Sequence, residues 1–243
     1  MLVEGRNPVL ETLKSEHKVT TIFLQNRMPV SEKIKKLLSK AHKKGVRIRK
    51  MSSNKLDKLS QTQNHQGVIA IVQHKTQTLS ETLDNLREKN KDPFLVFLND
   101  VIYQQNLGAI IRSAECAGCN GVIIPRNTTL TPEAIRSSMG ATEHIPIIQE
   151  SIFNALKILK DDGIPIIGLE ADGTSTIYEE NLTGPITFII GGEDKGITRS
   201  VLNKCDKVLK IPLYGKINSL NMSNSAAVVL FEKVRQELAK SGN

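Results

Sequence analysis

Three polar segments in the second half of the chain combine residue types that could do chemistry. The first is NDVIYQQNLGAIIRSA, at residues 99–114. Asn106 alone could be no more than the cap of the helix that follows. Arg112 is different, because its neighbours in the expected helix are apolar. A cation there needs a partner, either a carboxylate or a bound anion such as phosphate.

The second segment, IIGGEDKGIT at residues 189–198, predicts a strand, a glycine-rich turn and a helix. Such a turn commonly binds a cofactor through backbone groups. Gly191 and Gly196 have the spacing of a phosphate-binding P-loop, but Ile197 stands where that loop requires lysine, which argues against an NTPase. The two acidic residues Glu193 and Asp194 lie beside three glycines, which favours a binding site over a bare structural turn.

The third segment, KINSLNMSNSAA at residues 216–227, opens the last helix expected in the chain. Ser219 and Asn221 are either caps of that helix or groups of a site, and the residues alone leave both alternatives open. All three segments follow apolar strands directly or nearly so. Because ligands of open α/β sheets bind beyond the carboxyl ends of the strands, the three segments should converge there.

A parallel sheet is the element that must position these segments. The apolar run at residues 94–98 predicts a buried parallel strand. Helical patterns separate most of the expected strands, as a sheet covered on both faces requires. The last helix should run from about 221 to 239. Further strands are expected at 122–124, 145–148, 164–169, 187–190 and 208–211.

The first 75 residues predict a separate, small α/β unit. Asn7 is expected to cap a helix that ends near Lys14, and Ser31 a second one that Gly45 terminates. A polar stretch at 76–92, with a short helix at its centre, is expected to be the linker to the second unit. Strands are expected at 19–24, 46–48 and 68–72, and a short helix at 54–59.

Charge divides the chain in the same way. Residues 1–75 contain 16 Lys and Arg against 5 Asp and Glu, a net charge of +11, whereas the rest of the chain has a net charge of −3. A solvated basic face without a partner is the alternative, but this asymmetry favours a first unit that binds nucleic acid.

Composition excludes several other classes of protein. No apolar run is long enough to span a bilayer, and the first residues, MLVEGRNPVLETLK, lack the apolar core of a signal peptide, so we expect a cytoplasmic protein. Cys116 and Cys119 form a C-x-x-C, a pattern of redox or zinc sites. No second ligand pair appears at motif spacing, so small buried cysteines on a helix are favoured and no metal is expected.

Taken together, the three polar segments closely resemble the three motifs of the SpoU/TrmH family of RNA ribose 2′-O-methyltransferases, in the SPOUT superfamily. The N-x-G-x-x-x-R motif is at 106–112, G-x-E-x-x-G at 191–196 followed by Ile-Pro at 211–212, and S-L-N-x-S at 219–223. The first 75 residues, with HQGV at 65–68, resemble the RNA-binding extension of the ribosomal-RNA branch. Where the family usually has an acidic-Pro pair before the asparagine, this chain has Tyr103-Gln104-Gln105.

The resemblance implies a knotted methyltransferase domain at 93–243, with a deep trefoil knot in its parallel sheet, and a homodimer with the site near the interface. It implies S-adenosylmethionine as cofactor and, as substrate, a guanosine of large-subunit (23S) ribosomal RNA. Transfer RNA is the alternative substrate, and a non-catalytic RNA-binding or ribosome-assembly protein is the alternative function. Implied cofactor-binding residues are Gly191, Gly192, Ile211, Leu213 and Leu220, and implied catalytic residues are Asn106, Arg112, Glu193, Ser219 and Asn221.

Physical chemistry restricts the part that Arg112 could take. Methyl transfer from a sulfonium needs a positioned oxygen and no metal. A ribose hydroxyl is a poor nucleophile until its proton is removed or polarised. Because a guanidinium stays protonated in proteins, Arg112 is a poor base. We hypothesise that Arg112 clamps the adjacent RNA phosphate. Either this phosphate or a water molecule then accepts the proton of the ribose hydroxyl. Glu193 and Asn221 would then orient Arg112, Asn106 and the ribose.

Overall fold

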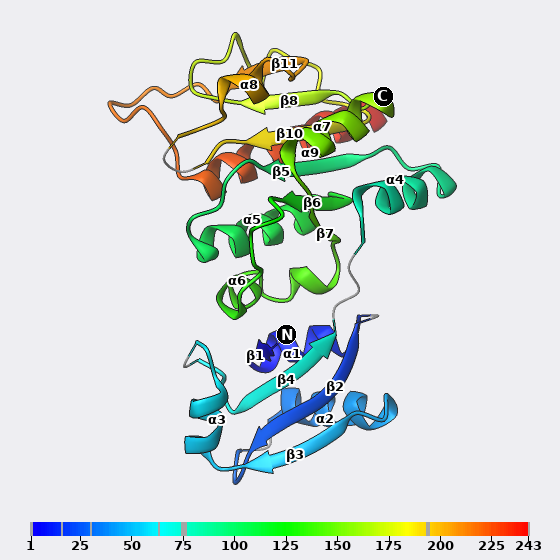
Figure 1. The fold of residues 1–243 in the computed structure, drawn as a ribbon, viewed down its shortest axis with the longest axis vertical. Helices are drawn as coiled ribbons and strands as arrows, with labels where there is room; N and C mark the ends of the chain where they lie inside the picture. Colours follow the sequence, from blue (N-terminus) through cyan, green and yellow to red (C-terminus); the bar gives the residue numbers. More distant parts are fainter. Residues whose placement is uncertain are drawn as a thin grey trace.

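The chain forms two α/β units, one above the other, in a computed structural model (Figure 1). The structure describes residues 2–15, 17–29, 31–62, 64–73, 77–192 and 195–242. Each unit has its own sheet, of four and seven strands respectively. None of the helices in these described ranges is long and apolar enough to cross a membrane.

The first sheet has the strand order β1-β4-β2-β3. Its pairs are antiparallel except for β2 with β3, which is parallel. Apolar residues of α1 and α2 cover one face of the sheet, and α3 covers part of the other. The elements are β1 (Leu2–Glu4), α1 (Arg6–Thr12), β2 (Lys18–Gln25), α2 (Glu32–Lys43), β3 (Arg47–Met51), α3 (Ser53–Leu59) and β4 (Val68–Gln73).

The two predicted helix caps of this unit have different outcomes. Ser31 caps α2, since its side chain accepts a hydrogen bond from the Ile34 N–H at 3.4 Å, as expected. Asn7 is not a cap, because α1 begins one residue earlier. Gly5 occupies the cap position with a φ of 99°, a conformation that favours glycine.

The second sheet is entirely parallel, with the order β7-β6-β5-β10-β8-β11-β9. This confirms the predicted parallel α/β fold, while the trefoil knot stays a prediction. The two-residue strand β9 is a polar edge strand that the sequence did not indicate. The strands are β5 (Phe94–Leu98), β6 (Gly121–Ile124), β7 (Ile147–Gln149), β8 (Ile166–Leu169), β9 (Ser175–Thr176), β10 (Ile186–Ile190) and β11 (Lys207–Lys210).

Helices cover both faces of this sheet, as its apolar strands require. One hydrophobic core joins the sheet to α5 and α9, and a second joins its other face to α4, α7 and α8. The segment expected as a linker therefore differs from expectation: its helix, α4, is part of the second core. The helices are α4 (Leu79–Glu88), α5 (Gln104–Cys116), α6 (Pro132–Ser137), the 3-10 turn η1 (Ala141–Glu143), α7 (Ile152–Asp161), α8 (Arg199–Leu202) and α9 (Met222–Ser241).

The two units contact each other where α6 packs on β1 and η1 packs on α1. Ile135 of α6 packs into the core of the first unit. The buried carboxylate of Glu143 accepts a hydrogen bond from the Ser15 hydroxyl at 3.3 Å. Glu11 and His144 pair at 3.2 Å beside it. These contacts fix how the basic unit sits against the second sheet.

Candidate active site

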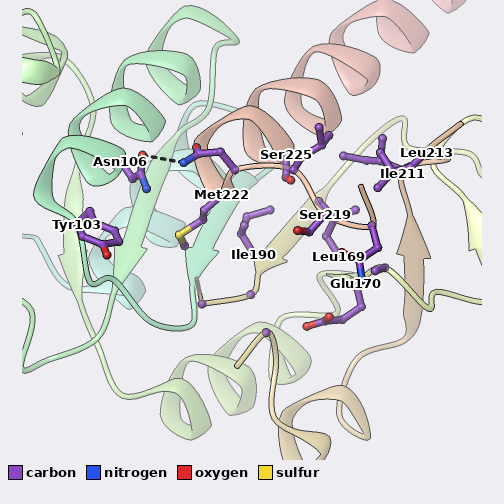
Figure 2. Close-up of a pocket in the computed structure, with 17 residues that line it drawn as sticks. Tyr103, Asn106, Leu169, Glu170, Ile190, Ile211, Leu213, Ser219, Met222 and Ser225 are labelled. Carbon is purple, nitrogen blue, oxygen red and sulfur yellow. Dashed lines mark hydrogen bonds between the residues drawn. The ribbon is translucent and has the colours of Figure 1, made fainter. Parts of the chain in front are cut away.

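A cavity of about 490 Å³ lies at the carboxyl ends of β8, β10 and β11, against the N-terminal ends of α5 and α9 (Figure 2). Each of the three polar segments contributes residues to its wall. The predicted convergence is therefore confirmed, and it follows from the parallel sheet, because strands of one direction end at one edge.

A glycine turn forms one wall of the cavity, directly after β10. A Cβ atom on Gly191 would lie 2.8 Å from the Gly196 Cα, and one on Gly192 would lie 2.7 Å from the Asp100 Cβ. Gly192 and Gly196 exchange both of their backbone hydrogen bonds, each at 3.1 Å. Only glycine fits here, so the turn presents bare backbone to the cavity.

Glu170 holds this turn from the neighbouring strand. Its carboxylate accepts a hydrogen bond from the Ile197 N–H. Gly196 has a φ of 60°, and a Cβ atom there would lie 2.6 Å from the Glu170 Oε1. Burial raises the pKa of Glu170, and the charge of Asp172 raises it further. The carboxyl group of Glu170 is thus half-buried against the backbone of the glycine turn.

Two asparagines meet at the opposite wall, where α5 and α9 begin. The Asn221 Nδ2 donates to the Asn106 Oδ1 at 3.3 Å. The Asn221 Oδ1 caps α9, accepting from the Ser223 N–H at 2.8 Å and from its hydroxyl at 2.6 Å. Asn106 is not a cap, because α5 begins at Gln104 and Tyr103 takes the cap position. Its amide therefore faces α9 and the cavity.

Arg112 lies apart from the cavity wall. It is exposed to solvent and forms neither a hydrogen bond nor an ion pair with any residue in the described ranges. Arg112 lies six positions after Asn106 on α5, so the two residues are about 9 Å apart along the helix axis and their side chains point about 120° apart around it. The argument that a cation in an apolar helix needs a partner is wrong here, because the side chain is in water. Its catalytic role stays a prediction.

The other predicted residues are distributed as follows. The five expected to bind the cofactor, Gly191, Gly192, Ile211, Leu213 and Leu220, all line the cavity, and so does Ser219, which does not cap α9. Glu193 and Asp194 lie outside the described residues. Sequence reasoning missed several lining residues, of which Glu170 and Ala171 directly follow β8 and could have been found by that position. The missed residues include Tyr103, Leu169, Glu170, Ala171 and Met222.

The cysteines divide between solvent and core. Cys116 is exposed, so its expected burial is wrong. Cys119 is buried, and burial raises the pKa of its thiol; burial also raises the pKa of Cys205 to about 11. In the part of the chain that the structure describes, no three His, Cys, Asp or Glu side chains are grouped to hold a metal ion.

The SpoU rRNA Methylase family model matches residues 93–231, which is more than half of the chain. The chain belongs to this family. Residues 2–78 match a second family model, described as RNA 2′-O ribose methyltransferase substrate binding. Membership of a methyltransferase family makes the chain an enzyme, and every residue that lines the cavity lies within the matched residues.

Named relatives extend over most of the chain. A 23S rRNA (guanosine-2′-O-)-methyltransferase, RlmB, of Vibrio vulnificus is 33% identical over 86% of this chain and 85% of its own length. An uncharacterized tRNA/rRNA methyltransferase of a Mycobacterium species (strain KMS) is 35% identical over 97% of this chain and 76% of its own. The SpoU methyltransferase AviRb from Streptomyces viridochromogenes, solved with AdoMet, has a TM-score of 0.81 and 25% identity, covering 98% of this chain and 91% of its own.

Proposed function

We propose that this protein transfers a methyl group from S-adenosylmethionine to the 2′-hydroxyl of a ribose in structured RNA, and that the nucleotide is a guanosine of large-subunit (23S) ribosomal RNA. The observation that carries the proposal is the cavity in which Asn106, Asn221 and the glycine turn come together. The name of the Vibrio relative supports the choice of substrate.

The residues present fit S-adenosylmethionine. Gly191 and Gly192 line the cavity, and neither position has room for a Cβ atom, so the turn offers backbone groups to the cofactor. Ile211, Leu213 and Leu220 add apolar surface, as cofactor pockets usually have. We assign these five residues to cofactor binding. When bound, S-adenosylmethionine supplies an electrophilic methyl group on a sulfonium sulfur.

The chain's own residues would orient the ribose and manage its proton. Asn106 and Asn221, joined by their hydrogen bond, offer amide groups to the ribose at the mouth of the cavity. Ser219 adds a hydroxyl farther along the cavity, near Leu169 (Figure 2), and Glu193 is assigned to orientation by the family motif. Arg112 is exposed on α5 and does not line the cavity, and we propose that it clamps a phosphate of the RNA backbone bidentately.

The first unit would supply most of the RNA affinity. Its net charge of +11 suits the neutralisation of phosphates, which is the main sequence-independent source of RNA binding. The match of residues 2–78 to a substrate-binding family supports this division of labour. We therefore assign residues 1–75 to RNA binding and residues 93–243 to methyl transfer. We also propose that the protein is cytoplasmic.

We also propose a homodimer that covers the loop beside the cavity. Between β11 and α9, Leu213, Tyr214, Ile217 and Leu220 are 38% to 95% exposed. Four apolar side chains in eight residues are unusual for a surface that stays in water. A second copy packed on this loop would bury them and close one side of the cavity. Light scattering should then give twice the mass of one chain.

The test is methyl transfer from labelled S-adenosylmethionine to unmodified 23S ribosomal RNA and, separately, to transfer RNA. We expect label in ribosomal RNA as an alkali-resistant 2′-O-methyl group, strongly reduced in Arg112→Ala and not restored by Arg112→Lys. Label in transfer RNA alone would show that transfer RNA, and not 23S ribosomal RNA, is the substrate. Absence of transfer to both, together with no cofactor binding in calorimetry, would indicate a non-catalytic RNA-binding protein. Nearly full turnover of Arg112→Lys would contradict the bidentate clamp.

A further inference from the structure

An aromatic side chain lies at the polar end of the cavity without a partner in the protein. Tyr103 lines the cavity and is 63% exposed. Its side chain makes no hydrogen bond, ion pair or ring contact with the residues at 2–15, 17–29, 31–62, 64–73, 77–192 and 195–242. The chain has no tryptophan and three tyrosines, and Tyr103 is the only aromatic residue among those described along this wall.

The backbone that carries this ring is firmly held. The Tyr103 carbonyl accepts from the N–H groups of Asn106 at 3.1 Å and Leu107 at 3.2 Å, which closes the first turn of α5. Leu107 is completely buried in the core beneath the sheet. The ring therefore projects from a fixed base, and only its own two side-chain torsions are free. Such a side chain can form a contact at a low cost in entropy.

The Tyr103 ring lies away from the residues that we assign to cofactor binding. Figure 2 shows Tyr103 and Asn106 at one end of the cavity, Ile211 and Leu213 at the other, and Ile190 and Met222 between them. The apolar end and the glycine turn fit the cofactor. Tyr103 instead stands beside the asparagines that we assign to the ribose. In a nucleotide the base is bonded to the carbon next to the one that bears the 2′-hydroxyl, so it must lie close to any group that flanks the ribose.

We propose that Tyr103 is the platform on which the base of the target nucleotide stacks. This inference rests on the proposed function. Proteins that act on single-stranded RNA splay bases out of the helix and stack them on aromatic rings. Every base has a π face, so such a platform selects an unpaired nucleotide over a paired one, whichever base it carries. The substrate class is thus a nucleotide in a loop or bulge whose base has left the stack.

The first experiment compares Tyr103→Ala and Tyr103→Phe with Tyr178→Ala, an exposed tyrosine away from the cavity. For the RNA identified by the transfer assay, Tyr103→Ala should lower kcat/KM by about tenfold, the size expected for one base stacked on one ring. Tyr103→Phe should restore most of it, since the ring and not the hydroxyl makes the contact. Tyr178→Ala should match wild type, and the affinity of Tyr103→Ala for S-adenosylmethionine in calorimetry should not change.

The second experiment asks whether the ring touches the base itself. A short RNA that carries the methylated position is compared with the same RNA made abasic there, so that the ribose remains. Wild type should lose about tenfold in kcat/KM on the abasic RNA, and Tyr103→Ala should lose nothing further. Penalties that multiply would overturn the proposal, because they would show that ring and base act independently.

Four other outcomes would also overturn it. Weaker cofactor binding by Tyr103→Ala would place the ring on the adenine of S-adenosylmethionine. A changed mass in light scattering would place it in a subunit interface. If wild type and Tyr103→Ala were equally active, this inference would be wrong and the proposed function would stand. If wild type were inactive, both the proposed function and this inference would be wrong.

Discussion

At the scale of single residues, Asn221 combines two tasks that a substitution can separate. Its Oδ1 caps α9, and its Nδ2 donates to Asn106. Asp is as good a cap as Asn but offers no amide donor. Asn221→Asp should therefore keep the melting temperature of the wild type while methyl transfer falls at least about tenfold, the size of one lost hydrogen bond to the reacting groups.

Asn221→Ala is the matched comparison, because it removes both tasks. It should lose about 1 kcal/mol of stability in addition to the activity. Full activity in Asn221→Asp would contradict the role that we assign to the amide. Thermal unfolding and the transfer assay, carried out on the same samples, distinguish the two tasks.

Gly196 provides a test of the glycine turn, because comparison with Gly163 separates backbone strain from a clash of the added Cβ atom. Gly196 and Gly163 both have positive φ angles, of 60° and 68°, but a Cβ atom would meet Glu170 at Gly196 and nothing within 4 Å at Gly163. Gly163→Ala should lose about 1 kcal/mol from backbone strain alone and bind S-adenosylmethionine normally. Gly196→Ala should lose more stability and most of its cofactor affinity. Equal cofactor affinity of the two variants in calorimetry would show that the turn does not hold the cofactor.

At the scale of elements, α2 presents a stripe of basic side chains to solvent. Lys33, Lys36 and Lys43 are exposed and lie at helical spacings on the side away from its buried residues. Changing all three to Gln should weaken RNA binding several-fold. The slope of log K against log salt concentration should fall by about 0.7–0.9 for each phosphate that the protein no longer neutralises.

The control for this change is a triple substitution of equal charge in the second unit. Lys89, Lys91 and Lys157 are also exposed. If their replacement by Gln weakened RNA binding as much, net charge alone would govern affinity and α2 would not be the contact surface. Filter binding across a range of salt concentrations measures both slopes.

The elements also show how far the sequence could predict the fold. Buried parallel strands are continuous apolar runs, so β5, β6, β8 and β10 were recognisable within two residues at each end. The polar edge strand β9 has no such signal. Helix α4 was expected in a linker because its surroundings are polar, but Leu79, Leu83 and Leu86 recur at helical spacing and are buried.

The same spacing explains the two errors in α5. Gln105, Arg112 and Cys116 share one stripe of the helix, seven and then four residues apart, and all three are exposed. Apolar neighbours in the sequence suggested a buried arginine and a buried cysteine, yet those neighbours lie on the opposite face. At the cavity, motif residues were predictable by resemblance. Glu170 belongs to no motif, and only its position after β8 could have pointed to it.

At the scale of the whole molecule, the junction between the two units contains a carboxyl group that should make stability depend on pH. The side chain of Glu143 is fully buried, and burial raises its pKa to about 7. Its neighbours there are Ser15, His17 at 3.7 Å and, on the same turn, His144. Because the unfolded chain loses this proton at a lower pH, stability should be highest below the ordinary pKa and fall as pH rises towards 7.

Glu143→Gln should remove that loss. Between pH 4.5 and pH 8 the free energy of unfolding of the wild type should fall by up to about 3 kcal/mol more than that of the variant. Glu88→Gln, at an exposed position on α4, should follow the wild-type curve. Urea unfolding at several pH values measures the difference, and parallel curves for wild type and Glu143→Gln would contradict the prediction.

The hydrogen bond between Asn106 and Asn221 joins residues 115 positions apart, and the cavity wall extends to Ser225. The first sheet, in contrast, is complete at Gln73. A ribosome synthesises the chain from its N-terminus, so the earlier unit emerges and can fold while the later residues are still untranslated. On a nascent chain, the proposed grip on RNA therefore exists before the pocket for the methyl donor. The capacity to hold RNA precedes the capacity to modify it.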